Sequence, residues 1–470
     1  ASSPAGPALR HRARGARIGR GLRSWLACAH SITSVHRRIG SSTPPPTITV
    51  VDDQAREAAP GTATRRFLTG AGAVTAGSML ANIAAYLLHL PASRWLGPEG
   101  YGAFAALLSA QLLVAVPSLA LQAVVARELV RGVPHDALRS LGRRVALLVA
   151  VIAALAVVPV SLLLDTPVLA TAAALAPGPV LCLLATEQGL LQGAERFRAL
   201  GVVLATAGAG KVVPAVAVLA AGGGVGPALA AGAVGVAAAW LVAARIVAAR
   251  TADLQSGPGP SASSRIGAGT DLAIASSPGV STVIAAGQVQ LVMMALTSID
   301  LLLARALLSP EDAGRYALGA VAAKAAFWLP QAVGTVLYPR MADPAGHRDA
   351  IRSAVGVLLG IGAFVVLAAA LVGPLVPALV GSDYAPVAGL LWAFAALGVT
   401  LSVLQAFLLA TIATDRTVEA GIAWGGLVLM VAAVWFAPRD VTGVLGAALV
   451  VVVITTIVAG WRAFRSRPAV

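Results

Sequence analysis

LGPEGYGAF, at residues 96–104, and LSPEDAGRY, at residues 308–316, share the pattern Pro-Glu-x-x-Gly-x-aromatic at an offset of 212 residues. A second match follows in the same order, at an offset of 213: Pro117 with Arg127, and Pro330 with Arg340, each pair ten residues apart. The seven-residue pattern alone would be weak in a chain with 49 glycines. Together with the proline and the arginine that follow it in the same order, the pattern indicates an internal repeat.

The composition places this repeat in a membrane protein. Of the 470 residues 58% are hydrophobic and 11% are charged, and the mean hydropathy is +0.84. A soluble domain carries roughly 25% charged residues, so a soluble globular fold is excluded. The apolar runs of about twenty residues match the thickness of a bilayer core. The sequence therefore predicts an all-α polytopic membrane protein.

Apolar runs and their Gly, Pro and polar breaks predict about twelve spans, six in each half. The first six lie near 67–91, 102–126, 144–164, 168–191, 199–221 and 226–249. The second six lie near 279–304, 314–338, 353–380, 386–411, 418–437 and 441–462. Six spans separate the two copies of the motif, so both halves cross the membrane in the same direction. Transporters use such parallel repeats about an axis along the membrane normal.

The flanking charges predict the orientation. With the N-terminus inside, nineteen arginines of residues 65–470 fall on the cytoplasmic side and four on the outside: Arg94, Arg305, Arg315 and Arg439. This asymmetry follows the positive-inside rule. We expect a multi-pass protein of the cell membrane, cytoplasmic or inner, with both termini in the cytoplasm. The outer loops are short, so we expect no extracytoplasmic domain.

The polar segments complete the domain organisation. We expect residues 1–64 to form a disordered, Arg-rich cytoplasmic tail, because the segment is polar and cannot build a core. Its composition also resembles that of a transit peptide. The other predicted parts are a six-helix lobe at 65–250, a cytoplasmic linker at 251–278, a six-helix lobe at 279–464 and a short tail at 465–470.

Charge and cysteine content narrow the function classes. The net charge of +14 sits where topology would place it, in the tail and at the cytoplasmic loops, so we expect contact with membrane lipids and no nucleic-acid partner. The two cysteines, Cys28 and Cys182, offer no disulfide framework. No Cys/His cluster has metal-ligand spacing, so we expect no metal and no cofactor.

Polar residues inside the spans point to a substrate path, because an ionisable side chain costs at least about 2.5 kcal/mol there. The only two lysines, Lys211 and Lys324, fall mid-span, and Gln331 follows Lys324 on the same helical face. They predict a cationic cavity; a structural lysine paired with a carboxylate is the alternative. Span 1 carries a polar face, and the repeat places Gln111 at the position of Lys324. The polar face comprises Thr75, Ser78, Asn82, Tyr86 and His89.

Two carboxylates and two arginines are further candidates. Asp300 and Glu187 are the acids that could couple transport to an ion, although Asp300 could instead pair with Arg305 and Glu187 could lie near the cytoplasmic interface. Arg127 and Arg340, at the inner ends of spans 2 and 8, could collect an anion at the cytoplasmic mouth. Ordinary positive-inside residues are the alternative for both.

The segments RWLGPEGYGAFAALLS, from Arg94, and DLLLARALLSPEDAGRYALGAVAAKAAFWLPQAVGTVLYPRMA, from Asp300, resemble a known family. They are similar to Wzx-type polysaccharide or oligosaccharide flippases of the multidrug/oligosaccharidyl-lipid/polysaccharide (MOP) exporter superfamily, over roughly residues 65–465. The resemblance implies a two-lobed transporter whose helices 1, 2, 7 and 8 face a central cavity. It implies a polyprenyl-diphosphate-linked glycan as substrate, surrounded by Lys324, Lys211 and the polar face of span 1.

The sequence thus predicts a non-enzymatic flippase that moves a lipid-linked oligosaccharide to the outer leaflet for cell-surface polysaccharide biosynthesis. Association with polysaccharide assembly machinery would fit this role. A MATE-like drug/cation antiporter of the same superfamily is the first alternative, and it should favour carboxylates over lysines. A membrane glycosyltransferase or glycan polymerase is the second, and a non-transporting scaffold the third.

Overall fold

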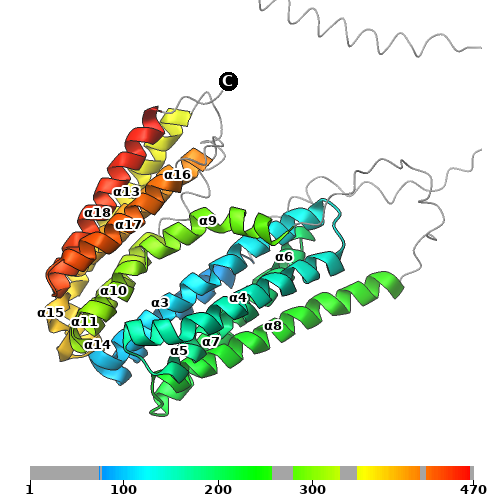
Figure 1. The fold of residues 1–470 in the computed structure, drawn as a ribbon, viewed down its shortest axis with the longest axis horizontal. Coiled ribbons are helices and arrows are strands. Elements are labelled where there is room, and N and C mark those ends of the chain that lie inside the picture. The colour runs from blue at the N-terminus through cyan, green and yellow to red at the C-terminus, as the bar shows by residue number, and fades with distance from the viewer. Residues whose placement is uncertain (1–73, 75–76, 257–278, 329–346, 413–419, 466–470) are drawn as a thin grey trace, which may run out of the picture. The chain divides into compact units, whose positions relative to one another are not determined.

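The computed structural model describes residues 74, 77–256, 279–328, 347–412 and 420–465 (Figure 1). Contacts along the chain separate residues 1–63 from residues 64–470, and every described residue belongs to the second unit. The predicted N-terminal tail, residues 1–64, and most of the predicted linker lie outside the described residues. The linker's first six residues are described, and they are helical because α8 continues to Ser256.

The first half of this unit consists of helices alone. A helical segment over residues 77–87 comes first. It is followed by α3 (His89–Val130), α4 (His135–Leu164), α5 (Val168–Leu175), α6 (Pro177–Gly193), α7 (Phe197–Ala220) and α8 (Val225–Ser256). Pro177 opens α6, where a missing backbone N–H costs nothing. By length and composition α5 and α6 together form one candidate span, Val168–Gly193.

The second half is also helical. Its first members are α9 (Val280–Leu296), α10 (Ile299–Leu307), α11 (Pro310–Trp328) and α13 (His347–Val372). Short turns follow: η4 (Gly373–Leu375), α14 (Val376–Val380), η5 (Ser382–Tyr384) and α15 (Ala385–Ala388). The last members are α16 (Leu391–Ile412), α17 (Ala420–Phe436) and α18 (Val441–Arg465).

The described helices confirm the polytopic all-α fold. Eight of them are long and apolar enough to cross a membrane, or nine if the bent pair α9 and α10 is one span. The sequence predicted about twelve spans, and the lower number found among the described helices has identifiable reasons. The described part of α11 ends at Trp328 and carries four charged residues, and α17 has only 17 residues. The remaining difference lies at residues 77–130.

Residues 77–130 pass as one helix of 54 residues. Such a helix would be about 80 Å long, whereas a bilayer core is roughly 30 Å thick. Gly97 breaks it, with φ 65° and ψ 177°, and Pro98 opens the following helix. Glycine adopts a positive φ without steric cost. The segment is therefore two spans joined at the loop that the sequence placed between spans 1 and 2.

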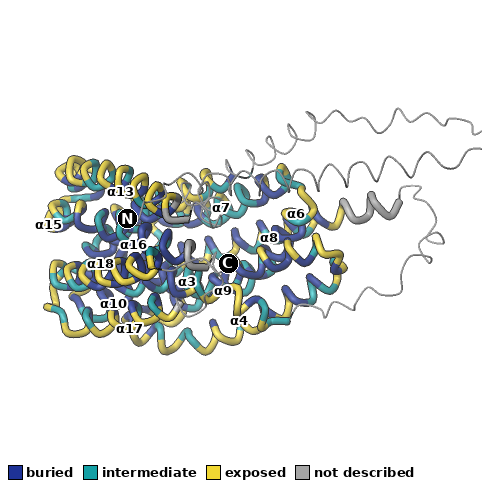
Figure 2. The backbone as a smooth tube through the Cα atoms, turned by 90° about the horizontal axis from the view of Figure 1, so that it is seen from above, coloured by how far each residue is buried: buried dark blue, intermediate teal, exposed yellow. Residues whose placement is uncertain are grey.

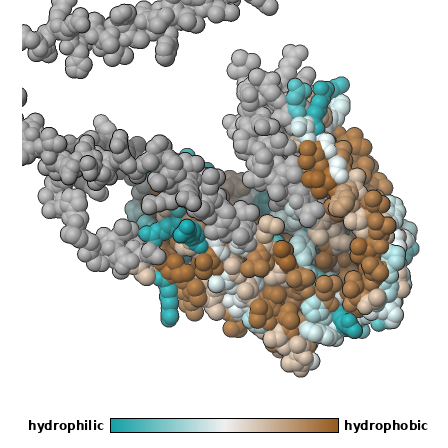
Figure 3. All heavy atoms as spheres, turned by 180° about the vertical axis from the view of Figure 1, so that it is seen from behind, coloured by the Kyte–Doolittle hydropathy of each residue, from teal (hydrophilic) through white to brown (hydrophobic). Residues whose placement is uncertain are grey.

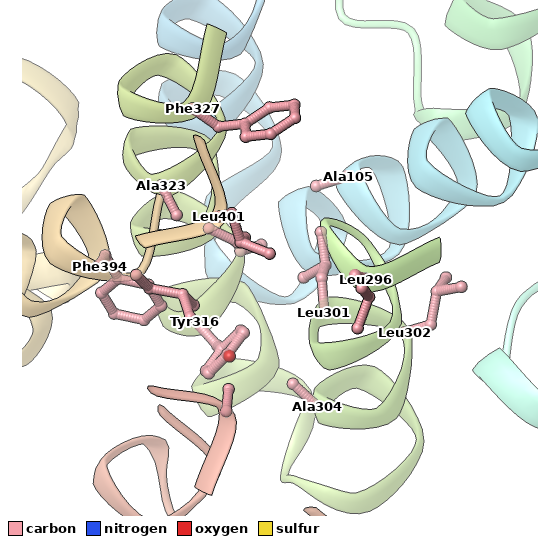
Figure 4. Close-up of a cluster of buried hydrophobic side chains, with 14 of the residues drawn as sticks. Ala105, Leu296, Leu301, Leu302, Ala304, Tyr316, Ala323, Phe327, Phe394 and Leu401 are labelled. Atoms are coloured by element: carbon pink, nitrogen blue, oxygen red, sulfur yellow. The ribbon is translucent and has the colours of Figure 1, made fainter. Parts of the chain in front are cut away.

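Each half packs mainly on itself. In the first half α3 packs against α6, α6 against α4, and α7 against α8, while in the second half α16 contacts α11, α13 and α18. The halves meet where α3 packs against α9, α10 and α11. Figure 4 shows part of this core, which includes Leu301 and Leu302 of α10 and Ala105 of α3.

Large apolar side chains also cover the outside of both halves. Figure 2 shows exposed residues along the outward sides of α4, α13 and α17, and Figure 3 shows hydrophobic residues over most of the coloured surface. Leu169 is 84% exposed and Phe436 is 86% exposed. A soluble protein rarely exposes such continuous apolar surface, so these faces fit contact with lipid.

Candidate functional site: a polar cluster between the two halves

Lys324 lies on α11 where this helix packs against α3. Its ammonium Nζ donates a hydrogen bond to the hydroxyl Oγ of Ser109 at 2.7 Å. The Ser109 hydroxyl in turn donates to the carbonyl oxygen of Ala105 at 2.9 Å. Lys324 is half-buried and Ser109 is buried. The bond therefore joins the second half to the first within the apolar part of the protein.

Asp300 lies on α10, close enough to Lys324 for the two charges to interact. The hydroxyl of Tyr316 donates to Oδ2 of Asp300 at 2.8 Å, whereas Oδ1 has no hydrogen-bond partner. The Tyr316 ring, seen in Figure 4, meets Phe394 edge to face at 5.0 Å. A buried carboxylate oxygen without a donor is costly. Asp300 is thus the acid of this cluster with spare capacity to accept a proton or a cation.

A break in the helix precedes Asp300. The axes of α9 and α10 differ by 43°, and Thr297 and Ser298 separate the two helices. The Thr297 hydroxyl donates to the carbonyl of Met294, but the buried hydroxyl of Ser298 has no partner. Discontinuous helices at membrane depth are tolerated where surrounding protein satisfies the freed polar groups. The sequence did not predict this break.

His89 is a third nitrogen-bearing side chain near this cluster. Its Nδ1 is 3.0 Å from the hydroxyl of Tyr101, and its ring lies within electrostatic range of both Lys324 and Lys211. Lys211, on α7, is half-buried, and its backbone packs against Gly232 of α8. Among the described residues, none of the six salt bridges includes either lysine. The alternative of a direct salt bridge between Lys324 and a carboxylate is therefore not seen among the described residues.

The other predicted cavity residues differ in how far they are buried. Ser78 and Tyr86 are half-buried and Asn82 is exposed. The side chain of Gln111 is buried, and its Oε1 has no hydrogen-bond partner. Gln331, Arg340 and Thr75 lie outside the described residues.

Glu187 and Arg127 form local ion pairs. The carboxylate of Glu187 accepts two bonds from the guanidinium of Arg139, at 3.0 and 3.1 Å, and its side chain is 8% exposed. Arg127 is 3.0 Å from Glu128, and its own side chain is 49% exposed. The first contact joins α4 to α6, and the second lies near the C-terminal end of α3. Neither contact tests the predicted transport role of Glu187 or Arg127.

The suggested pair of Asp300 with Arg305 does not form. The Arg305 guanidinium instead donates to the carbonyl oxygens of Leu164 and Asp165, at 2.9 and 3.1 Å. The sequence shows that Arg305 is charged and lies near the end of a span, but it does not show that Arg305 contacts the C-terminal end of α4. Sequence reasoning also missed Ser109, Tyr101 and Tyr316 as site residues. For Tyr316 a signal was present, because it is the aromatic residue of the repeated motif.

Solved structures resemble this fold at low sequence identity. No known family model and no curated protein matches the chain. An inward-facing multidrug resistance MATE family transporter of the MOP superfamily gives a TM-score of 0.59 at 14% identity, over 82% of this chain and 94% of the other. The lipid II flippase MurJ, in an inward closed conformation, gives a TM-score of 0.59 at 12% identity, over 84% of this chain and 87% of that protein. A Vibrio cholerae MATE transporter gives 0.51 at 16% identity, over 86% and 97%.

The chain has the fold of these transporters. At such identities the likeness is one of fold alone. It covers both halves of the repeat, because more than four fifths of this chain aligns with each of the three proteins.

Proposed function

We propose that this chain is a transporter of the MOP type that moves a polyprenyl-diphosphate-linked oligosaccharide from the cytoplasmic to the outer leaflet by alternating access. The Wzx-type flippases are the branch that its sequence resembles. Its fold is shared with a flippase of a lipid-linked substrate and with drug transporters, so the fold leaves the cargo open. The choice of cargo rests on the charges between the halves.

The contact of Lys324 with Ser109 carries this proposal. It puts an ammonium group between the two halves, with a neutral hydroxyl as its hydrogen-bond partner. A cation in an apolar surrounding favours an anionic partner strongly. A diphosphate supplies that charge and several acceptor oxygens. Since helices of both halves contribute to this contact, binding there can be coupled to their relative movement.

The remaining candidates have distinct roles in this mechanism. Lys211 and His89 supply further nitrogen groups near the diphosphate, on helices other than that of Lys324. Gln111, Asn82, Ser78 and Tyr86 offer hydrogen bonds to sugar hydroxyls, and Gln331 would add another. Arg127 and Arg340 attract the anion at the cytoplasmic mouth. The polyprenyl tail stays in lipid while the halves move.

A MATE-like antiporter of drugs or cations is the alternative that a specific observation favours. Asp300 is 4% exposed, and one of its oxygens lacks a donor. A carboxylate in that state would attract a cationic substrate as readily as a coupling ion. The enzyme alternative, a membrane glycosyltransferase or glycan polymerase, has no comparable observation in its favour among the described residues.

Reconstituted vesicles separate these functions. A fluorescent polyprenyl-diphosphate oligosaccharide is added to one leaflet, and its arrival in the other is followed with a membrane-impermeant quencher. The same vesicles are then tested for uptake of a lipophilic cationic dye. Flipping of the glycan lipid without dye uptake supports the proposal. Dye uptake without flipping overturns it in favour of the antiporter.

A further inference from the structure

Arg305 closes the last turn of α10 and reaches across to the first half of the protein. Its side chain is 8% exposed, and its Nε and Nη2 donate to the carbonyl oxygens of Leu164 and Asp165, respectively. Those two carbonyls stand at the C-terminal end of α4. Of the six salt bridges among the described residues none includes Arg305. A helix end, not a carboxylate, therefore holds this guanidinium.

The end of α4 is well suited to bind a cation. The last carbonyls of a helix lack partners within the helix, and the helix dipole makes that end negative. Asp165 has the left-handed conformation, with φ 46° and ψ 59°, and its N–H donates to Ser161. The Ser161 hydroxyl bonds the carbonyl of Thr166, which fixes the turn. Arg305 thus caps α4 from the opposite half, with two donors of one planar group.

Other contacts between the halves lie at the same end of the helices. We define the outer end by its loops, residues 97–98, 165–167, 308–309 and 381–385, which the charge pattern places outside. The hydroxyl of Tyr384 donates to the carbonyl of Ser93 at 3.1 Å, and the Tyr384 ring meets Tyr101 at 6.2 Å. Ser93 and Tyr384 belong to different halves. Three polar bonds, two of them buried, therefore hold the halves together at the outer end.

We propose that Arg305 is a latch that keeps the outer end closed by capping α4, and that the transport cycle must release it. The inference rests on the proposed alternating-access function. Release exposes a guanidinium and two carbonyl oxygens, so water has to enter the outer end as the halves part. Rebinding restores two charge-assisted hydrogen bonds at once. Arg305 is thus a two-state element whose bonds exist only while the outer end is closed.

Cysteine labelling of the purified full-length chain in detergent tests the latch without any substrate. The reporter is Ser93→Cys, because Ser93 is completely buried and the carbonyl that accepts from Tyr384 belongs to the backbone. Cys28→Ser removes the cysteine of the tail, and Cys182, also completely buried, reports general loosening. We expect Arg305→Gln to raise the rate at which N-ethylmaleimide modifies the reporter on the order of tenfold, because two bonds of the closed state are lost. The rate at Cys182 should not change.

Three matched variants sharpen the test. Arg315→Gln removes another arginine of the outer end whose bonds, to Asp312, Glu311 and the Asp383 carbonyl, all stay within the second half. It should leave the reporter rate unchanged. Asp165→Gly keeps the carbonyl and suits the left-handed backbone, so it should preserve the latch. Arg305→Lys keeps the charge with a different donor geometry and should give an intermediate rate.

The outcomes are separable. The latch is overturned if Arg305→Gln and Arg305→Lys label the reporter at the parent rate, or if Cys182 reacts faster in parallel with the reporter. It is also overturned if Arg315→Gln matches Arg305→Gln. Where Arg305→Gln yields no folded protein, the Arg305→Lys rate decides alone. Because labelling needs no cargo, a protein that opens as described but does not flip the glycan lipid would reject the proposed substrate and keep the latch.

Discussion

Gly102 and Gly314 occupy the same position in the two copies of the repeated motif, and their backbones pack against each other. A β-carbon on Gly102 would lie 2.9 Å from the backbone nitrogen of Gly314, and one on Gly314 would collide with the carbonyl oxygen of Pro98. Equivalent residues of a parallel repeat meet only near the axis that relates the copies. The glycines of the motif therefore allow α3 and α11 to approach closely between the halves.

Replacing Gly314 by alanine should destabilise the protein. Alanine gains up to about 1 kcal/mol of helix propensity over glycine, but a β-carbon against a backbone carbonyl costs about 1–3 kcal/mol because neither backbone can move freely. We expect a lower midpoint of thermal unfolding in detergent for Gly314→Ala, and a smaller loss for Gly102→Ala. Gly360→Ala is the control, since no atom lies within 4 Å of its β-carbon. It should be neutral or stabilising, and an equal loss there would contradict the packing argument.

The motif shows how far the sequence alone could lead. The equivalence of Gly102 and Gly314 was readable from two quoted stretches, and composition predicted the spans because lipid requires continuous apolar helices. The contact of Lys324 with Ser109 could not be predicted from the sequence. Spacing assigns both residues to helix faces, but the rotation and depth of each helix are set by packing. The contacts of Arg305 could not be predicted for the same reason, because its partners are backbone atoms 141 and 140 residues away in the sequence.

Neutralising Glu187 should affect folding before transport. Glu187 is nearly buried against Arg139. Removing one partner of a fully buried pair costs about 3–5 kcal/mol because the other charge is left uncompensated, and we expect a smaller cost here because the Arg139 side chain is 25% exposed. We expect Glu187→Gln to lower the amount of folded protein in the membrane, while transport per folded molecule stays normal. The double variant Arg139→Gln/Glu187→Gln should recover abundance. Normal abundance with lost transport would instead support the ion-coupling role predicted from the sequence.

Asp440 should make stability depend on pH at the start of α18. The hydroxyl of Thr442 and the backbone N–H of Gly443 both donate to its Oδ1 at 2.6 Å, and these bonds lower the pKa of the carboxyl below its ordinary value. A carboxyl with a lowered pKa stabilises the folded state above its unfolded pKa, and this stability is lost as pH falls through the folded pKa. We expect the thermal midpoint to decline below about pH 4. Asp440→Asn should keep part of the cap but remove this pH dependence, which scans at several pH values would show.

Asp300→Asn tests whether the buried acid couples transport to an ion. Asparagine still offers an oxygen to the hydroxyl of Tyr316 but cannot take up a proton or balance a cation. We expect the variant to fold and bind cargo, and to lose the acceleration that a proton or sodium gradient gives. Vesicles with each gradient in turn identify the ion. Tyr316→Phe is the companion variant, because it removes the donor at Oδ2 and leaves the carboxylate in place. Unchanged gradient dependence in Asp300→Asn would exclude this residue from coupling.

Lys324→Gln tests the charge on which the proposed function rests. Glutamine keeps much of the length and polarity but removes the charge that would balance a diphosphate, so flipping per folded protein should collapse. Lys324→Arg keeps the charge in a broader planar group and should retain partial activity. Lys211→Gln should act in the same direction, and the double variant should be no worse than the more severe single variant if both lysines bind one diphosphate. Ser109→Ala removes only the hydroxyl that orients Lys324, so it should weaken flipping without abolishing it.

A structural Lys324 would behave differently in the same assay. If its main task were to balance Asp300, Lys324→Gln would leave a buried carboxylate uncompensated and would reduce the amount of folded protein. Adding Asp300→Asn would then restore abundance and transport together. The charge-binding role predicts the opposite, because neutralising Asp300 returns no cation to the site. Flipping of the glycan lipid, normalised to folded protein from size-exclusion chromatography, separates the two roles, and normal flipping by Lys324→Gln would remove Lys324 from the proposed site.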